Sequence, residues 1–172
     1  MSLKVLWKRP ESRFLILFLA ILAVSFTVVA LRPVNDGVVV PYTTFIATIS
    51  GHILRLLGED LTINGCVLSS PRFAVTIYNG CNGLITSLIF ISGVLAFPAT
   101  LRAKAIGIVG GLLAIQVINQ IRIVSLFYIG VFAPQFFNQS HVFIWQSLVI
   151  LAGVALWVMW AHRFAALEQA RA

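Results

Sequence analysis

Two apolar runs, each close to the length of a membrane span, constrain the fold of this chain most strongly. They read FLILFLAILAVSFTVVAL from Phe14 to Leu31 and HVFIWQSLVILAGVALWVMW from His141 to Trp160. A helix needs ~20 mostly apolar residues to cross ~30 Å of hydrocarbon. Because 60% of the 172 residues are hydrophobic and only 10% are charged, a soluble domain of this size would lack the polar residues to cover its surface. We therefore predict an α-helical integral membrane protein, folded as one membrane domain over residues 1–172.

Four transmembrane helices are predicted from these two runs and two others. They cover residues 14–31, 83–97, 105–131 and 141–160. The second is just short of a full span and is ended by Pro98. The first is too long for the apolar region of a signal peptide and no small-residue cleavage site follows it, so we expect a retained anchor.

Basic residues lie at the ends of the predicted spans, where they select membrane orientation. In chain order they form three groups, namely Lys4, Lys8, Arg9 and Arg13, then Arg102 and Lys104, then Arg163 and Arg171. With four crossings all three groups fall on the cytoplasmic side, so we predict a multi-pass protein of the cytoplasmic (inner) membrane with both termini inside. The net charge of +7 does not indicate nucleic-acid binding, because no basic cluster has interleaved aromatic residues.

Residues 32–80 form the predicted extracytoplasmic insert. Within it, Val38–Gly58 is apolar enough to suggest a fifth span, but it contains His52 and Arg55. A fifth crossing would also place the Arg102–Lys104 turn outside, against the charge rule. The apolar residues of the segment fall on one helical face, so we expect a helix that lies on the outer membrane surface.

The pattern changes to strands after this helix. β-Branched residues surround Asn64–Gly65, and this dipeptide is a strong signal for a two-residue hairpin turn. A further short strand is expected from Phe73 to Tyr78. The sequence therefore predicts a small extracytoplasmic β-hairpin that leads directly into the second span.

Three reactive or charged side chains fall near the outer ends of different predicted spans. Cys81 directly precedes the second span, which starts outside, and His141 opens the fourth. Arg122 lies about eighteen residues beyond Lys104, or ~27 Å along a helix that rises 1.5 Å per residue, which brings it to the outer boundary. A nucleophile, a general acid/base and a fixed positive charge are a set suited to acyl transfer.

Each of these residues also has a structural interpretation. An isolated cysteine in a membrane protein is most often a small packing residue, an arginine can snorkel to the headgroups, and histidines are common at membrane boundaries. Several local features support a functional Cys81, although local sequence alone still favours packing. Gly80 and Gly83 allow a sharp turn and close approach of a substrate. A helix N-terminus favours the thiolate and supplies N–H groups for an oxyanion.

Two other polar residues bear on this site. Asn119 lies one helical turn before Arg122 on the same face, so a polar stripe leads toward the arginine. Cys66 is also extracytoplasmic and could pair with Cys81, but a disulfide would silence the nucleophile. A structural or incidental role is therefore expected for Cys66.

Taken together, these segments resemble the exosortase/archaeosortase family of membrane-embedded transpeptidases. The resemblance rests on GCNGL at Gly80–Leu84, NQIRI at Asn119–Ile123 and His141 at the start of the last span. It covers roughly Leu56 to Trp160.

The short chain is similar to the compact exosortase H subgroup. It departs from many family members at Asn82, where they have Ser, and at Trp145, where they have a small residue. These departures concern the subfamily and the motif that it recognises more than the chemistry.

The resemblance implies Cys81 as nucleophile, Arg122 as stabiliser of the transition state or of a substrate carboxylate, and His141 as general acid/base. Supporting or substrate-binding roles are expected for four neighbours, Asn82, Asn119, Gly80 and Gly83. The implied activity is cleavage of C-terminal sorting signals at the outer face of the membrane through a thioester, with transfer to an envelope acceptor. The implied partners are membrane lipid and an exported protein that ends in a motif, a transmembrane helix and a basic tail. No metal, cofactor or nucleic acid is expected.

The alternative function is a non-enzymatic small transporter subunit or assembly factor. It predicts that Arg122 and Asn119 line a path and that Cys81 is dispensable, although no internal repeat supports a transporter. Other intramembrane proteases are not indicated, because the sequence has no HExxH motif, no paired intramembrane aspartates and no Gly-x-Ser-Gly run; the nearest match is FISG at Phe90–Gly93. Reaction of Cys81 with a membrane-impermeant thiol reagent separates the enzymatic and non-enzymatic interpretations.

Overall fold

Five main helices make up most of the part of the chain that the structure, a computed structural model, describes (residues 9–169). They are α2 (Pro10–Ala30), α4 (Val40–Leu56), α5 (Leu84–Ala96), α6 (Leu101–Phe132) and α8 (Gln146–Gln169). Short helical turns connect some of them: α3 (Arg32–Val34) and a π-helical turn (Asn35–Val39) before α4, and a 3-10 turn (Pro134–Phe136), α7 (Phe137–Gln139) and a second π-helical turn (Ser140–Trp145) before α8. Three residues used above for the orientation, Lys4, Lys8 and Arg171, lie outside the described residues.

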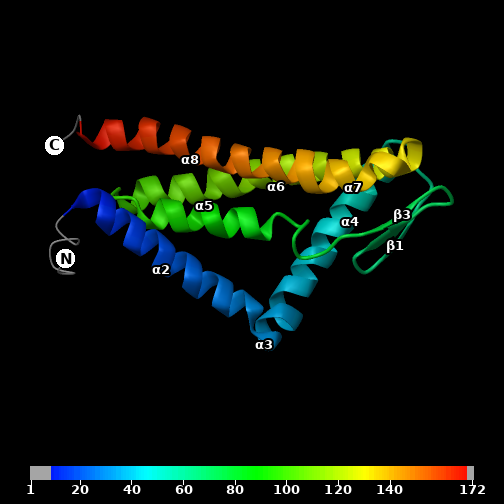
Figure 1. Cartoon of the computed structure of the whole chain (residues 1–172), viewed down its shortest axis with the longest axis horizontal. Helices are drawn as coiled ribbons and strands as arrows, with labels where there is room; N and C mark the ends of the chain where they lie inside the picture. Colours follow the sequence, from blue (N-terminus) through cyan, green and yellow to red (C-terminus); the bar gives the residue numbers. More distant parts are fainter. Residues whose placement is uncertain (1–8, 170–172) are drawn as a thin grey trace.

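The helices form an elongated bundle with the sheet at one end (Figure 1). α5, α6 and α8 run alongside one another, and α2 packs against α5. α4 turns back from the end of α2 and crosses obliquely toward the sheet. The start of α2, the α5–α6 turn and the end of α8 lie together at the opposite end. This arrangement agrees with an even number of crossings between the start of α2 and the end of α8.

The structure confirms an α-helical membrane protein with four helical segments long and apolar enough to cross a bilayer, namely Pro10–Ala30, Arg32–Leu56, Leu101–Phe132 and Pro134–Phe164. Three of these segments match the predicted spans 14–31, 105–131 and 141–160. The fourth segment, Arg32–Leu56, was not among the predicted spans. It contains most of the helix that was predicted to lie on the outer surface, and it is long and apolar enough to cross a bilayer. The predicted span 83–97 instead forms α5, whose 13 residues extend only ~20 Å at 1.5 Å per residue. α5 packs against α2, α6 and α8, so neighbouring protein surrounds much of this short helix.

The predicted hairpin is present and belongs to a three-stranded antiparallel sheet of order β1–β2–β3. The strands are β1 (Thr62–Asn64), β2 (Val67–Ser69) and β3 (Ala74–Thr76). Asn64 pairs with Val67, so the hairpin loop consists of Gly65 and Cys66 and lies one residue later than predicted. Gly65 has a φ of +57°, which places the glycine in the left-handed region that the turn requires.

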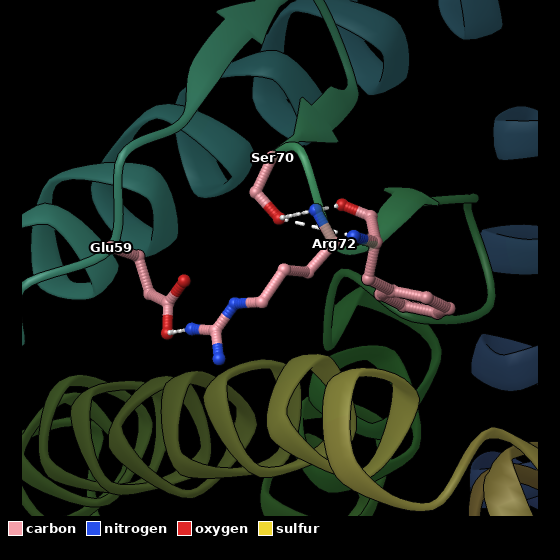
Figure 2. A network of polar contacts seen from close by, with 4 residues as sticks. Glu59, Ser70 and Arg72 are labelled. Atoms are coloured by element: carbon pink, nitrogen blue, oxygen red, sulfur yellow. Dashed lines mark hydrogen bonds and ion pairs between the residues drawn. The ribbon is translucent and has the colours of Figure 1, made fainter.

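Polar contacts tie the sheet to α4 (Figure 2). Arg72, between β2 and β3, donates to Glu59 just after α4 at 2.6 Å. The hydroxyl of Ser70 accepts the backbone N–H groups of Arg72 and Phe73 at 3.3 and 3.1 Å, which fixes the β2–β3 turn. On the apolar side, α4, α6 and the sheet share one buried cluster, formed by Ile46, Ala47, Leu54, Leu61, Leu68, Ile77, Ile123 and Phe127. The sheet, α4 and the C-terminal half of α6 are therefore one packed unit, from which the chain enters α5.

Candidate active site

A tight loop between β3 and α5 carries Cys81. The Cys81 N–H donates to the Tyr78 carbonyl at 2.8 Å, which closes a turn. Gly83 precedes α5 with a φ of +79°, which favours glycine, and a Cβ there would lie 2.8 Å from the Gln116 amide nitrogen, which would have to move. Gly80 has no such requirement, because its φ is not positive and a Cβ would meet open space. Of the two glycines, only Gly83 therefore has a backbone conformation that requires glycine.

Asn82 fastens this loop to α4. Its side chain is fully buried. The Asn82 amide oxygen accepts the N–H of Leu84 at 2.9 Å, and the amide nitrogen donates to the Thr43 hydroxyl at 2.8 Å. The Tyr42 hydroxyl donates to the Asn82 carbonyl at 3.3 Å. Two consecutive α4 residues therefore fix Asn82, because Tyr42 bonds its backbone and Thr43 bonds its side chain.

Arg122 reaches the cysteine from α6. Its side chain is only 2% exposed. One terminal guanidinium nitrogen, Nη2, lies 3.8 Å from Cys81 Sγ and donates to Gln146 Oε1 at 3.3 Å. Among the described residues no carboxylate forms an ion pair with Arg122, and its Nε has no hydrogen-bond partner. A buried, unneutralised cation of this kind is costly and favours the arrival of negative charge beside it.

His141 completes the cluster from the π-helical turn that precedes α8. Its Nε2 lies 2.8 Å from Cys81 Sγ. The imidazole ring stacks on Phe137 with ring centroids 6.1 Å apart and planes 11° from parallel. Because a π-helical turn hydrogen-bonds residues five apart, it brings His141 and Gln146 toward a common face, where one contacts Cys81 and the other contacts Arg122. The structure therefore brings Cys81, Arg122 and His141 together, as the helix-end argument predicted.

Burial sets the resting state of the nucleophile. It raises the pKa of the Cys81 thiol above its ordinary value, against the smaller lowering effects of Arg122 and of a backbone hydrogen bond at Tyr78. The expectation that a helix N-terminus favours the thiolate is thus wrong for the free protein. Cys81 stands two residues before the Gly83 cap, and the nearby N–H groups of Cys81 and Leu84 are already bonded to other acceptors. At neutral pH Cys81 is a thiol that needs a base, and His141 is in contact with it.

Asn119 lies one turn before Arg122 and is fully buried. Both its amide atoms lack hydrogen-bond partners within the described part of the chain. A Cβ at Gly83 would lie 3.3 Å from the Asn119 side chain, so Asn119 packs beneath the Cys81 loop. The predicted polar stripe on α6 also includes Gln116, which donates to the Tyr42 hydroxyl. Asn119 is therefore placed to support the loop or to bond a group that enters the site.

Several residues at the site were not predicted. Gln146 orients Arg122, Thr43 holds Asn82, and Phe137 stacks on His141. Gln146 could have been found as a polar residue inside an apolar span, and Phe137 as the residue one turn before His141. Thr43 gives no such signal, because its contact depends on how α4 packs against a loop 39 residues away.

A cavity of about 300 Å³ adjoins the cluster. Cys81 and His141 line one part of it, and the stretch Phe73–Tyr78 lines another. Cys66 is not among its lining residues. The Cys66 thiol is free and lies 3.5 Å from the Thr44 hydroxyl. The described residues contain no group of three or more His, Cys, Asp or Glu side chains that could hold a metal ion.

The geometry suits nucleophilic attack by a thiol on a carbonyl carbon. A base contacts the thiol, a buried cation lies beside the sulfur, and a cavity gives access to both. In comparisons with known proteins, the family model described as transmembrane exosortase (Exosortase_EpsH) matches residues 5–161. No curated protein and no solved structure matches the chain.

Proposed function

The chain belongs to the transmembrane exosortase family, and from this premise we propose that it is a membrane-embedded cysteine transpeptidase that cleaves C-terminal sorting signals of exported proteins. The observation that carries the proposal is the contact of 2.8 Å between Cys81 Sγ and His141 Nε2 beside the buried guanidinium of Arg122. In this proposal the site residues take the roles that the resemblance implies. Cys81 is the nucleophile, His141 the general acid/base, and Arg122 the stabiliser of developing negative charge.

The first half of the reaction is acylation of Cys81. His141 Nε2 takes the thiol proton as the sulfur attacks the scissile carbonyl carbon, and the carbonyl electron pair moves onto oxygen. Arg122 stabilises this oxyanion, because its guanidinium is buried and has no carboxylate partner among residues 9–169. When the intermediate collapses, His141 returns the proton to the leaving amine. The C-terminal segment departs and the upstream segment remains as a thioester on Cys81.

The second half is transfer to an acceptor. A nucleophile of the envelope, or water, loses a proton to His141 and attacks the thioester carbonyl. A second oxyanion forms beside Arg122, and the thiol leaves with the proton that His141 returns. The balance between transfer and hydrolysis depends on which nucleophile reaches the thioester first.

The proposal includes an orientation. The basic ends of α2, α6 and α8 belong to the cytoplasmic side of the inner membrane, and Cys81 with the sheet faces outward. The substrate is an exported protein whose C-terminus has a motif, a transmembrane helix and a basic tail. Its helix lies against the bundle within the bilayer, and its motif meets Cys81 at the outer surface.

The test is co-expression with an epitope-tagged protein that ends in such a tripartite signal. We expect Cys81→Ser and His141→Ala to abolish cleavage. Cys66→Ser is the matched control, because it makes the same substitution at a thiol that contacts Thr44 and not the site. Undiminished processing by the Cys81→Ser protein would end the proposal and favour the non-enzymatic alternative.

A further inference from the structure

β3 is an edge strand that leads directly to Cys81. It pairs with β2 on one side and has no strand on the other. In an antiparallel ladder, residues alternate between pairs that exchange both backbone hydrogen bonds and pairs whose N–H and C=O groups point outward. Ile77 donates to the Cys66 carbonyl at 2.8 Å, and Ser70 donates to the Phe73 carbonyl at 2.9 Å. The bonded β3 positions are therefore 73, 75 and 77.

The intervening positions are Ala74 and Thr76, opposite Ser69 and Val67. Their backbone N–H and C=O groups point away from β2. Within the described residues no backbone hydrogen bond satisfies them. β3 thus presents two donors and two acceptors at the spacing that an added strand requires.

The cavity beside Cys81 runs along this free edge. Every residue from Phe73 to Tyr78 lines it, together with Cys81 and His141. Successive side chains of a strand point to opposite faces, so a cavity that touches all six in turn lies along the edge of the strand and not against one face. The free backbone groups and the reacting atoms therefore share one space.

We propose that the substrate segment on the acyl side of the scissile bond binds as an added strand, parallel to β3. This inference rests on the proposed function and specifies how its substrate is held. The direction follows from geometry. β3 runs toward Cys81, so a parallel segment ends with its carbonyl carbon at the sulfur, and its upstream residues lie over the sheet, at the end of the molecule away from the chain termini (Figure 1).

The cavity also selects a side chain. The ionisable residues that line it are Tyr78, Cys81 and His141. Seven of the other lining residues are apolar, namely Phe73, Ala74, Val75, Ile77, Ile123, Leu126 and Phe137. An ammonium there would lose its hydration and would find no carboxylate among the lining residues. The cavity therefore favours an apolar substrate side chain over a cationic one, while the backbone pairing with Ala74 and Thr76 is independent of sequence.

The test uses tripeptidyl acyloxymethyl ketones, which alkylate a catalytic thiolate as their carboxylate leaves. The probes are acetyl-Ala-Leu-Ala acyloxymethyl ketone and three analogues, each N-methylated at one amide, applied to the full chain in lipid nanodiscs. A strand presents only alternate amides to its partner. We expect N-methylation to slow Cys81 labelling about fivefold, the effect of one lost hydrogen bond, at alternate amides and to change it little at the amide between them. A Leu→Lys probe should label at least tenfold more slowly.

Two variants locate the pairing on β3. Thr76→Pro removes an outward N–H without touching the β2 ladder, and we expect it to abolish the alternation. Thr76→Val keeps the N–H and should retain it. If Thr76→Pro fails to fold, the probe series on the unmodified protein still tests whether the substrate binds as a strand. Uniform sensitivity to N-methylation, or a tripeptide that labels no faster than acetyl-Ala acyloxymethyl ketone, overturns the inference.

Iodoacetamide separates failure of this inference from failure of the proposed function. It is too small to reach Ala74 or Thr76 while it alkylates Cys81. Suppose that alkylation depends on His141 and that Cys81→Ser loses cleavage, but that N-methylation shows no alternation. The added-strand inference is then rejected and the transpeptidase function stands. Cleavage that persists in Cys81→Ser removes both.

Discussion

Arg122→Gln tests whether the buried guanidinium acts through its positive charge or only fills space. Arg122 is 2% exposed and its Nη2 lies 3.8 Å from Cys81 Sγ. Arg122 therefore adjoins the attacking sulfur, and the nearby N–H groups of Cys81 and Leu84 are already engaged. Removal of one well-placed oxyanion donor lowers kcat by about 10²- to 10³-fold. We expect a loss of that size for Arg122→Gln.

Arg122→Lys separates charge from geometry. Lysine keeps the positive charge but loses the planar fork by which one side chain addresses Cys81 and Gln146 together. We expect a loss of about tenfold, smaller than that of the glutamine variant, because attraction to the oxyanion survives while one oriented hydrogen bond is lost.

The assay has two readouts on membranes that contain each variant. Single-turnover cleavage of the tagged substrate reports acylation, and the rate of iodoacetamide alkylation against pH reports ionisation of Cys81. Arg122 lowers the Cys81 pKa, although burial has the larger, opposite effect. Loss of the charge should therefore move the alkylation midpoint to higher pH in Arg122→Gln, with little movement in Arg122→Lys. In both, the midpoint should lie above the ~8.5 of a free cysteine.

The control is the same substitution at Arg55, whose guanidinium donates to the Leu61 carbonyl at 2.9 and 3.1 Å and has no contact with Cys81. Arg55→Gln should leave the alkylation midpoint unchanged. Two results together would refute the electrostatic role and assign Arg122 to packing. They are equal losses of cleavage in the two Arg122 variants and an alkylation midpoint that is the same in every variant and in the unmodified protein.

Three further substitutions test the support of the site. Gly83→Ala should destabilise the protein by about 1–3 kcal/mol in thermal unfolding, because its φ is +79° and its Cβ would meet Gln116. Gly80→Ala should be neutral, and equal effects of the two substitutions would contradict the assigned loop geometry. Gly111→Ala, whose Cβ would overlap the Phe90 ring, should cost about 1–3 kcal/mol, and Gly110→Ala, which faces open space, should cost little. Gln146→Leu should lower kcat about tenfold with KM little changed, because it frees the Arg122 guanidinium without removing it, and an effect on KM alone would show that Gln146 binds substrate instead.

The convergence of the site was predictable because it depends on the membrane. Spans of fixed length and the distribution of basic residues place helix ends in layers, and helical rise places Arg122 in the layer of Cys81 and His141. The hairpin was predictable from Asn64–Gly65 for a local reason, although pairing of Asn64 with Val67 shifts the loop by one residue. Both features follow from short-range chemistry or from a constraint common to all membrane proteins.

Other features depend on packing that no local pattern specifies. The hydrogen bond between Asn82 and Thr43 joins residues 39 positions apart. The π-helical turn at Ser140–Trp145 that aligns His141 with Gln146 has no signature in the sequence. The sequence placed α5 to within one residue at each end, but a helix enclosed by α2, α6 and α8 need not match the bilayer on its own, and only the packing shows that enclosure.

The state of Cys81 shows why a local rule gave the wrong sign. Proximity to a helix N-terminus lowers a thiol pKa, but burial between α6 and the His141 turn outweighs it. The resting site thus combines a neutral thiol with a guanidinium that lacks a carboxylate partner in the described structure. Negative charge appears beside Arg122 only when His141 takes the proton and the sulfur attacks. Because the interaction is stronger in that state than at rest, Arg122 stabilises the transition state more than the free enzyme, which is the condition for catalysis.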